Sequence, residues 1–420
     1  MRKLETLLLC ALILILTGCG SSGAARQYST VPASSMASSS ETTVSEMTAS
    51  TTATSSEAAV TGTPADFPDA SQIAEEMGVG INLGNTMEAY DATGCEKITF
   101  DWIPAIGNNT PADYETCWGA PVTTQAMIDG IKAAGFNTVR IPVFWGNMMA
   151  DDGTYTINSD YIKRVKEIVD YCMNDDMYAV INIHHFDEFI IRRNSLNDCE
   201  KIFNTLWTQI AQYFRDYSDK LIFEGFNEYL GGKVFDNSGN LVDLSKKDGY
   251  AMTNALNQTF VDAVRASGGN NSERTLIISG YWTNIDLTTD DQFIIPADTA
   301  RNKLMVSVHY VDNTMYWNNN IGGQKWIDYI DSQCALLTKA FTSKNIPVFI
   351  GETTSIYPNE RMAADSVCRT SSECLKQVLD KLLDCGFVPV LWDVTDNFYS
   401  RNDCKIKSDT DAEVIKSIME

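Results

Sequence analysis

The sequence has little positive charge. Its 420 residues contain 32 lysines and arginines against 55 aspartates and glutamates, which gives a formal net charge of −23 and a pI near 4.5. A surface this acidic repels phosphate backbones and anionic lipid headgroups, so the composition argues against nucleic acid as a partner. It suits a neutral or cationic substrate, although solubility alone also accounts for it.

Cysteine is scattered without a pattern. Nine of the eleven cysteines follow Cys19, and they lack the short repeated spacings of zinc sites and small disulfide-rich domains. Cys368 and Cys374 are near enough in sequence to pair, which the sequence alone does not decide. We expect most of these cysteines to be small buried apolar side chains.

The N-terminal residues have the pattern of an export signal. Arg2 and Lys3 precede an apolar run, residues 7–16, that is too short to span a bilayer as a mature helix. The run ends in Leu-Thr-Gly-Cys at 16–19, which resembles a bacterial lipobox and implies cleavage before Cys19 and a lipid on its sulfur. The alternative is an ordinary signal peptide with a chance cysteine. We expect the protein to lie outside the cytoplasm, lipid-anchored at the cell surface or secreted, with the anchor as its only membrane contact.

A tether follows the signal. Residues 20–65 contain 21 serines or threonines among 46 positions and almost no large apolar groups. Such a segment buries too little apolar surface to offset its chain entropy, so we expect a flexible linker. The sequence therefore divides into a lipoprotein signal peptide (1–19), a linker (20–65) and one folded domain (66–420).

Short apolar runs alternate with amphipathic stretches throughout the domain. Continuous Val/Ile/Leu runs are typical of strands buried on both faces, as in parallel sheets. The eight predicted strands are 78–83, 138–143, 178–184, 221–226, 275–280, 304–309, 347–351 and 388–392. The helices predicted between them are 124–134, 159–174, 199–217, 247–266, 325–344 and 372–385.

Eight such units predict an α/β fold of the (β/α)8 TIM-barrel class. An open doubly wound sheet is the alternative, but it needs a glycine-rich phosphate turn after the first strand, and residues 80–85 do not form one. Residues 231–243 predict an inserted hairpin. A calcium loop from Asp236, Asn240 and Asp243 is the alternative there, although it lacks calcium-loop spacing.

The carboxyl ends of the predicted strands carry polar and aromatic side chains, and in a barrel these ends meet at one mouth. All three histidines of the protein lie there. The candidate site residues are Arg140, His184, His185, Asn227, Glu228, His309, Glu352 and Trp392.

Two of these residues, Glu228 and Glu352, are carboxylates of the kind that glycosidic cleavage needs. One protonates the leaving oxygen, and the second attacks the sugar when the two lie roughly 5–5.5 Å apart. We expect Arg140 to keep Glu352 ionised and desolvation to raise the pKa of Glu228. A structural ion pair is the alternative for Arg140. Asn227 can bond the sugar 2-hydroxyl, and Trp392 offers a floor for stacking.

Nine segments together resemble glycoside hydrolase family 5, and most of all its subfamily 4 of bacterial endoglucanases and xyloglucanases. The segments are 80–89, 115–123, 134–143, 181–185, 223–228, 280–284, 306–310, 350–352 and 390–393. The resemblance implies a retaining, endo-acting hydrolase of β-1,4-glucan chains, whether cellulose-like, mixed-linkage or xyloglucan. It implies no metal and no organic cofactor.

The same resemblance implies a role for each candidate residue. Glu228 corresponds to the general acid/base after the fourth strand, and Glu352 to the nucleophile after the seventh. The supporting polar shell corresponds to Arg140, His184, Asn227 and His309, and the substrate contacts correspond to His185 and Trp392.

Three positions depart from the family pattern. Tyr229 replaces a proline after the acid/base, and Thr353 replaces an aromatic residue after the nucleophile. Val311 replaces a tyrosine that bonds the nucleophile; adjacent Tyr310 should point to the opposite side and not substitute. These changes leave open a catalytically impaired glycan-binding lipoprotein. Mannan or xylan also remains open as substrate, because specificity resides in loops.

Overall fold

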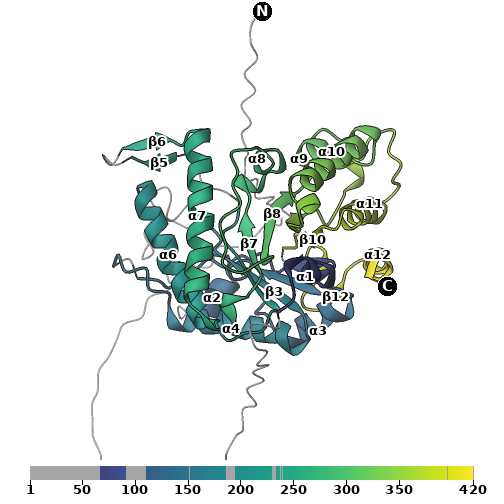
Figure 1. Cartoon of the computed structure of the whole chain (residues 1–420). Helices are drawn as coiled ribbons and strands as arrows, with labels where there is room; N and C mark the ends of the chain where they lie inside the picture. Colours follow the sequence, from purple (N-terminus) through teal and green to yellow (C-terminus); the bar gives the residue numbers. More distant parts are fainter. Residues whose placement is uncertain are drawn as a thin grey trace, which may run out of the picture. The chain divides into compact units, whose positions relative to one another are not determined.

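The structure, a computed structural model, describes residues 67–90, 110–150, 152–185, 194–228, 233–236, 238, 240–394 and 396–419. The predicted signal peptide, the lipobox with Cys19 and the linker lie outside these residues. Within them, eight parallel strands close into a barrel in the order β1-β10-β9-β8-β7-β4-β3-β2. Helices surround this barrel (Figure 1), and the predicted (β/α)8 fold is confirmed.

Each barrel strand falls within or overlaps one of the predicted strands, which are all confirmed. The strands are β1 Gly80–Asn82, β2 Thr138–Ile141, β3 Tyr178–Asn182, β4 Leu221–Glu224, β7 Leu276–Ser279, β8 Leu304–Tyr310, β9 Val348–Thr353 and β10 Val388–Leu391.

The six predicted helices are also present. They are α3 Gln125–Ala133, α4 Ser159–Asn174, α6 Leu196–Tyr213, α7 Lys246–Ala266, α10 Gln324–Ala340 and α11 Ser371–Asp384. Polar N-caps start several of them: the Asn158 side chain accepts backbone N–H groups at the start of α4, and Ser195 and Thr370 do the same for α6 and α11. Further helices are α1 Ala70–Met77, α2 Pro111–Glu115, α8 Ile285–Thr288, α9 Asn313–Trp317 and α12 Asp409–Met419.

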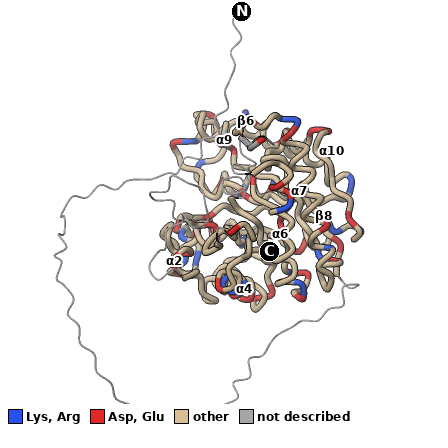
Figure 2. Tube along the Cα trace, turned by 90° about the vertical axis from the view of Figure 1, so that its left-hand side faces the viewer, with Lys and Arg blue, Asp and Glu red and all other residues tan. Residues whose placement is uncertain are grey.

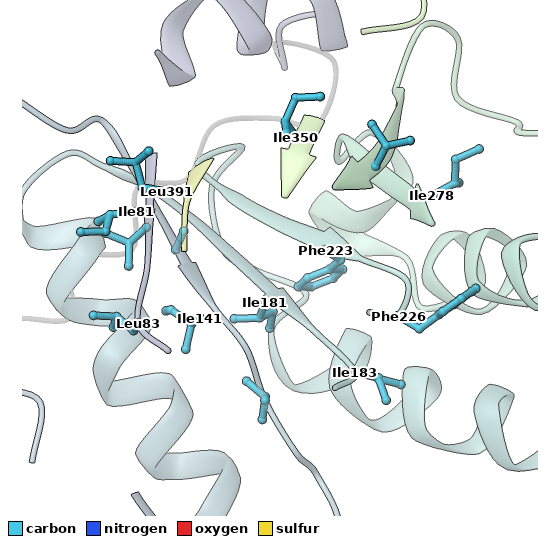
Figure 3. Close-up of a cluster of buried hydrophobic side chains, with 14 of the residues drawn as sticks. Ile81, Leu83, Ile141, Ile181, Ile183, Phe223, Phe226, Ile278, Ile350 and Leu391 are labelled. Carbon is cyan, nitrogen blue, oxygen red and sulfur yellow. The ribbon is translucent and has the colours of Figure 1, made fainter. Parts of the chain in front are cut away.

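Alternate residues of the barrel strands face two different environments. Ile81, Ile141, Ile181 and Phe223 belong to the large apolar layer between the barrel and its helices, part of which appears in Figure 3. Because side chains alternate along a strand, their neighbours face the barrel interior. The polar residues next to these apolar ones in sequence therefore point into the barrel interior, where they form the site described below.

The barrel interior near the amino ends of the strands is apolar and is closed by α1. Ile73 and Met77 of α1 pack with Val180, Ile222 and other strand residues in a second buried cluster. Next to β8, the Lys303 ammonium donates to the backbone carbonyls of residues 67 and 68, both at 2.7 Å. The described chain therefore enters the domain at the amino ends of the strands, opposite the mouth.

The predicted insertion after β4 is a hairpin. β5 Lys233–Phe235 and β6 Leu241–Asp243 pair antiparallel. The Asp236 carboxylate accepts backbone N–H groups of residues 238 and 240, both at 2.9 Å, as an Asx turn does. This carboxylate therefore stabilises the turn, which agrees with a plain hairpin.

The described surface is mixed in charge. Figure 2 shows acidic positions distributed around the chain trace with basic positions between them. No helix among the described residues is both long and apolar enough to cross a membrane. Cys368 and Cys374 carry thiols and are not joined by a disulfide.

Candidate active site

A one-residue bulge at Gly351 places Glu352 in the mouth. Ile350 lies opposite Val308, whereas Glu352 lies opposite His309, and the pairing with β10 shifts at the same place. A bulge redirects the side chains beside it. A Cβ at Gly351 would lie 3.1 Å from the His309 ring, so a larger residue would crowd His309.

Glu228 follows β4 on a segment held by neighbouring strands. The backbone N–H of Gly225 donates to Ile277 of β7 at 2.9 Å, and that of Asn227 donates to Ile183 beyond β3 at 3.0 Å. The Trp207 indole of α6 donates to the Gly225 carbonyl at 2.9 Å. These contacts fix the direction in which Glu228 leaves the barrel.

Glu228 and Glu352 face one another at the mouth. One oxygen of each carboxylate and a ring nitrogen of His309 all lie within 4.8 Å of one another. This separation is close to the roughly 5–5.5 Å of retaining glycosidases and below the roughly 6.5–9.5 Å of inverting ones. The trio could also ligate a cation, but Glu228 is already bonded to His309, and Glu352 to Arg140.

Arg140 lies beside Glu352, as predicted. Its side chain on β2 also contacts side chains from β1 and β4. Its buried guanidinium donates from Nε to Glu224 at 2.7 Å and from Nη2 to Asn227 at 2.8 Å. Nη1 donates to both Asn82 and Glu352 at 3.0 Å. The predicted alternative therefore holds as well: Arg140 forms an ion pair inside the barrel, with Glu224.

His309 forms a hydrogen bond with Glu228, and this bond makes the pKa of Glu228 differ from the one expected. Its Nδ1 lies 2.7 Å from Glu228 Oε1 and 3.6 Å from Glu352 Oε2. Burial raises the pKa of Glu228, but the hydrogen bond and charge of His309 outweigh burial, so this pKa lies below its ordinary value. The expectation that desolvation leaves this pKa above its ordinary value is therefore wrong.

The pKa of Glu352 shifts in the opposite direction. Burial raises it above its ordinary value, and although the charges of His309 and Arg140 act against this, they do not cancel it. Arg140 therefore lowers the pKa of Glu352, as expected, but burial and the charge of Glu228 outweigh its effect. Burial lowers the pKa of His309, but the charges of the two catalytic-site glutamates raise it above its usual value.

A row of aromatic rings leads away from this pair. The His184 and Trp392 rings are stacked at 6.5 Å between centroids, and His184 contacts His185 at 4.7 Å. His185 contacts Tyr90 at 5.1 Å, and Tyr90 contacts Trp118 at 5.2 Å. Trp118 is 38% exposed, and its indole N–H donates to the Tyr90 carbonyl at 2.7 Å. Trp392 follows β10, the two histidines follow β3, and Tyr90 and Trp118 lie between β1 and β2.

His184 is neutral in this row. Burial, together with the charges of His185 and Arg140, lowers the pKa of His184 well below its usual value. A neutral imidazole can accept as well as donate a hydrogen bond, which suits a side chain facing sugar hydroxyls.

The structure shows the surroundings of two residues, Tyr310 and Thr353, that bear on the departures from the family pattern. Tyr310 is buried with its ring 6.0 Å from that of Tyr329 on α10, so it points away from the mouth as expected. Thr353 ends β9 and accepts the Trp392 N–H through its backbone carbonyl at 2.8 Å, a contact that any residue type could make. Tyr229 lies outside the described residues.

Sequence reasoning missed Glu224 and Asn182 as parts of the site. Asn182 donates to Glu224 at 3.1 Å, and Asn82 accepts from Arg140. A signal was available: Glu224 sits within an apolar run assigned to a strand buried on both faces, and a fully buried carboxylate needs a partner. Arg140 lies in another such run.

A closed (β/α)8 barrel whose mouth holds two carboxylates at this spacing has the architecture of a retaining glycoside hydrolase. The sequence pattern described as cellulase (glycosyl hydrolase family 5) matches residues 103–398, which include all the candidate residues except Cys19. The chain belongs to glycosyl hydrolase family 5.

Known relatives agree with this assignment. The chain is 38% identical over 307 residues to endoglucanase A of Clostridium longisporum, covering 70% of this chain and 55% of that protein; it thus spans about half of that relative. A GH5-4 broad specificity endoglucanase from an uncultured bovine rumen ciliate has a TM-score of 0.68 at 31% identity, covering 84% of this chain and 98% of that one. A family 5 xyloglucanase from Paenibacillus pabuli gives 0.67 at 31%, covering 83% and 100%. The predicted likeness to subfamily 4 is confirmed.

Proposed function

We propose that this protein is a retaining, endo-acting glycoside hydrolase that cleaves β-1,4-linked glucan chains. The observation that carries the proposal is the close approach of the Glu228 and Glu352 carboxylates at the mouth of a family 5 barrel. The similarity of this chain to endoglucanases and to a xyloglucanase supports glucan as the substrate class.

The surroundings of the two carboxylates support distinct roles. Glu352 has a side chain only 12% exposed and is held by Arg140, which orients its oxygen for attack on the anomeric carbon. Glu228 has a side chain 39% exposed, so a leaving oxygen and later a water can reach it. Glu228 therefore protonates the leaving oxygen as the Glu352 ester forms, and then deprotonates the water that hydrolyses this ester.

His309 supports the proton distribution that the reaction needs. His309 favours an ionised Glu228, whereas leaving-group departure requires that Glu228 be protonated. His309 Nδ1 faces both carboxylates, so a protonated His309 can release its proton to Glu228 and take another from Glu352. This relay leaves His309 protonated as before, Glu352 ionised and Glu228 protonated.

The test compares wild type with Glu352→Ala and Glu228→Ala on carboxymethylcellulose, xyloglucan, mannan and xylan, with reducing ends and anomeric configuration as readouts. We expect the wild type to act on the two glucans with retention and both variants to lose at least about 10³-fold in kcat. Undiminished hydrolysis by Glu352→Ala would refute the assigned mechanism. Oligosaccharide binding by the wild type without any release of reducing ends would identify a glycan-binding protein instead.

We also propose that the protein is exported and carries a lipid on Cys19. The apolar run before the Leu-Thr-Gly-Cys motif supports this, as does a polymeric substrate too large to enter a cell. Mass spectrometry of the N-terminal peptide from the membrane fraction tests it, with Cys19→Ala as the control. A mature N-terminus other than a lipid-modified Cys19 would contradict the anchor.

A further inference from the structure

Glu224 ends β4, shares Arg140 with Glu352, and is completely buried. Both of its oxygens are engaged. Oε2 accepts from Arg140 Nε at 2.7 Å and from the Asn182 amide at 3.1 Å, and Oε1 accepts from the Ser307 hydroxyl at 2.7 Å. A side chain held by donors from three other strands has one available orientation.

The guanidinium of Arg140 is held between two carboxylates. Glu224 takes the Nε edge, and Glu352 takes one hydrogen of Nη1. Because a guanidinium is planar with fixed donor directions, fixing the Nε edge also fixes where Nη1 points. The position of Glu352 therefore depends on a residue that never contacts the substrate.

Charge follows the same arrangement. One positive guanidinium faces two negative carboxylates within a buried site, where like charges repel strongly because little water screens them. The share of the Arg140 charge that Glu224 neutralises is not available to stabilise the ionised form of Glu352.

We propose that Glu224 is a positioning residue for glycoside cleavage, which fixes the Arg140 guanidinium against Glu352 and shares its positive charge. The proposal rests on the proposed function, since it assigns Glu352 as the nucleophile. It separates two contributions, placement and charge, that two substitutions can test one at a time.

Glu224→Gln keeps the shape of the side chain and removes its charge. The full charge of Arg140 then acts on Glu352, so the acid limb of the kcat/KM profile should move to lower pH by about half a unit or more. Glu224→Asp keeps the charge and withdraws the carboxylate by one methylene. It should leave the limb in place and lower kcat roughly tenfold, because Arg140 is no longer held in position.

Glu115 provides a matched control. It is also a completely buried glutamate paired with an arginine, Arg164, at 2.8 Å, but it lies outside the mouth. Glu115→Gln removes the same charge from a similar pair, so any loss of stability should resemble that of Glu224→Gln. It should leave the pH profile where it is.

The experiment measures kcat and kcat/KM from pH 3 to pH 9 for all four proteins, with circular dichroism to establish the folded fraction. Carboxyl ¹³C NMR titration of Glu352 adds a readout that needs no turnover. A shift of the acid limb, or of the Glu352 titration, in Glu224→Gln alone supports the proposal. An unmoved limb in Glu224→Gln, or an equal shift in Glu115→Gln, overturns it. Loss of activity in Glu352→Ala tests the proposed function separately, whatever Glu224 does.

Discussion

Arg140 on β2 donates a hydrogen bond to Glu352 on β9 at 3.0 Å, although the two residues are 212 positions apart in the chain. Two strands, β1 and β10, separate β2 from β9 around the barrel, so the contact crosses the barrel interior. Closure of the barrel is therefore what assembles the site. Any change that opens the sheet at β1 or β10 removes this contact as well.

The supports of Glu352 explain why its surroundings matter for rate. Its described partners are Arg140 and His309, and both are shared with other carboxylates. Tyr310 points toward α10 and cannot contribute. A family 5 nucleophile usually has a tyrosine at the position that Val311 occupies here, so Glu352 has one support fewer.

Val311→Tyr should speed the reaction. Because side chains alternate along a strand and Tyr310, the last residue of β8, points toward α10, we expect the side chain of Val311 to point toward the mouth. A phenol donating to the Glu352 carboxylate would add a hydrogen bond worth about 1.5–3 kcal/mol. We expect kcat on an aryl cellobioside to rise about tenfold.

Val311→Phe is the matched control, because it adds the ring without the hydroxyl. It should leave kcat within about twofold of wild type. If the phenylalanine and tyrosine variants have equal kcat, the hydroxyl does not reach Glu352 and the reason given for the gain is wrong.

Much of the fold could be read from the sequence because barrel strands are buried on both faces. Runs such as 178–184 have the continuous apolar character of parallel strands, and eight of them with helices between leave few topologies. The catalytic candidates followed, since residues at strand ends must meet at one mouth. The match of predicted and observed strands, and the contact between Arg140 and Glu352, follow from these two rules.

The protonation of the site could not be predicted in the same way. The pKa of Glu228 depends on whether His309 Nδ1 lies 2.7 Å away or farther, and strand assignment does not determine such distances. The bulge at Gly351 could not be predicted from the sequence either. It moves Glu352 by one register position, and only the pairing with β8 and β10 reveals it. Trp118 lies in the family-like segment 115–123, but its contacts with Tyr90, 28 residues earlier in the chain, could not be read from that segment.

Trp118→Ala should weaken action on long substrates and spare short ones. Trp118 is the exposed member of the group of rings that includes Trp392, and it contacts His185 and Tyr90. A glucan chain that extends over this group from the two carboxylates would reach it after His184 and His185. Loss of its apolar surface should cost about 1–2 kcal/mol, or roughly 5–30-fold in kcat/KM on cellohexaose. An aryl cellobioside, which is too short to reach the ring, should be cleaved as by wild type.

Tyr213→Ala controls for loss of an exposed ring. Tyr213 is 39% exposed and ends α6, which leads back to the amino ends of the strands and away from the mouth. This variant should not change kcat/KM for either substrate. Equal losses on cellohexaose and on the aryl cellobioside in Trp118→Ala would show that the ring supports the fold rather than the distant end of the chain.

Asp312→Asn should flatten the dependence of stability on pH. Asp312 follows β8 and is buried, and its carboxylate accepts from the Trp326 indole at 3.0 Å and the Tyr357 hydroxyl at 2.8 Å. Burial raises its pKa from 3.8 to about 6, against these hydrogen bonds. The folded protein therefore binds a proton more tightly than the unfolded chain does. The resulting stability is fully present below about pH 4 and is lost as pH rises through 6, by at most about 3 kcal/mol.

An asparagine has the same shape and does not ionise, so the variant lacks this loss. Urea unfolding at pH 4, 5, 6 and 7 should show the free energy of unfolding of wild type falling relative to the variant as pH rises. Asp365→Asn, which replaces an exposed aspartate in the loop after β9, should run parallel to wild type. Parallel curves for Asp312→Asn and wild type would mean that Asp312 has the same proton affinity in the folded and unfolded chains, and that burial does not govern this carboxylate.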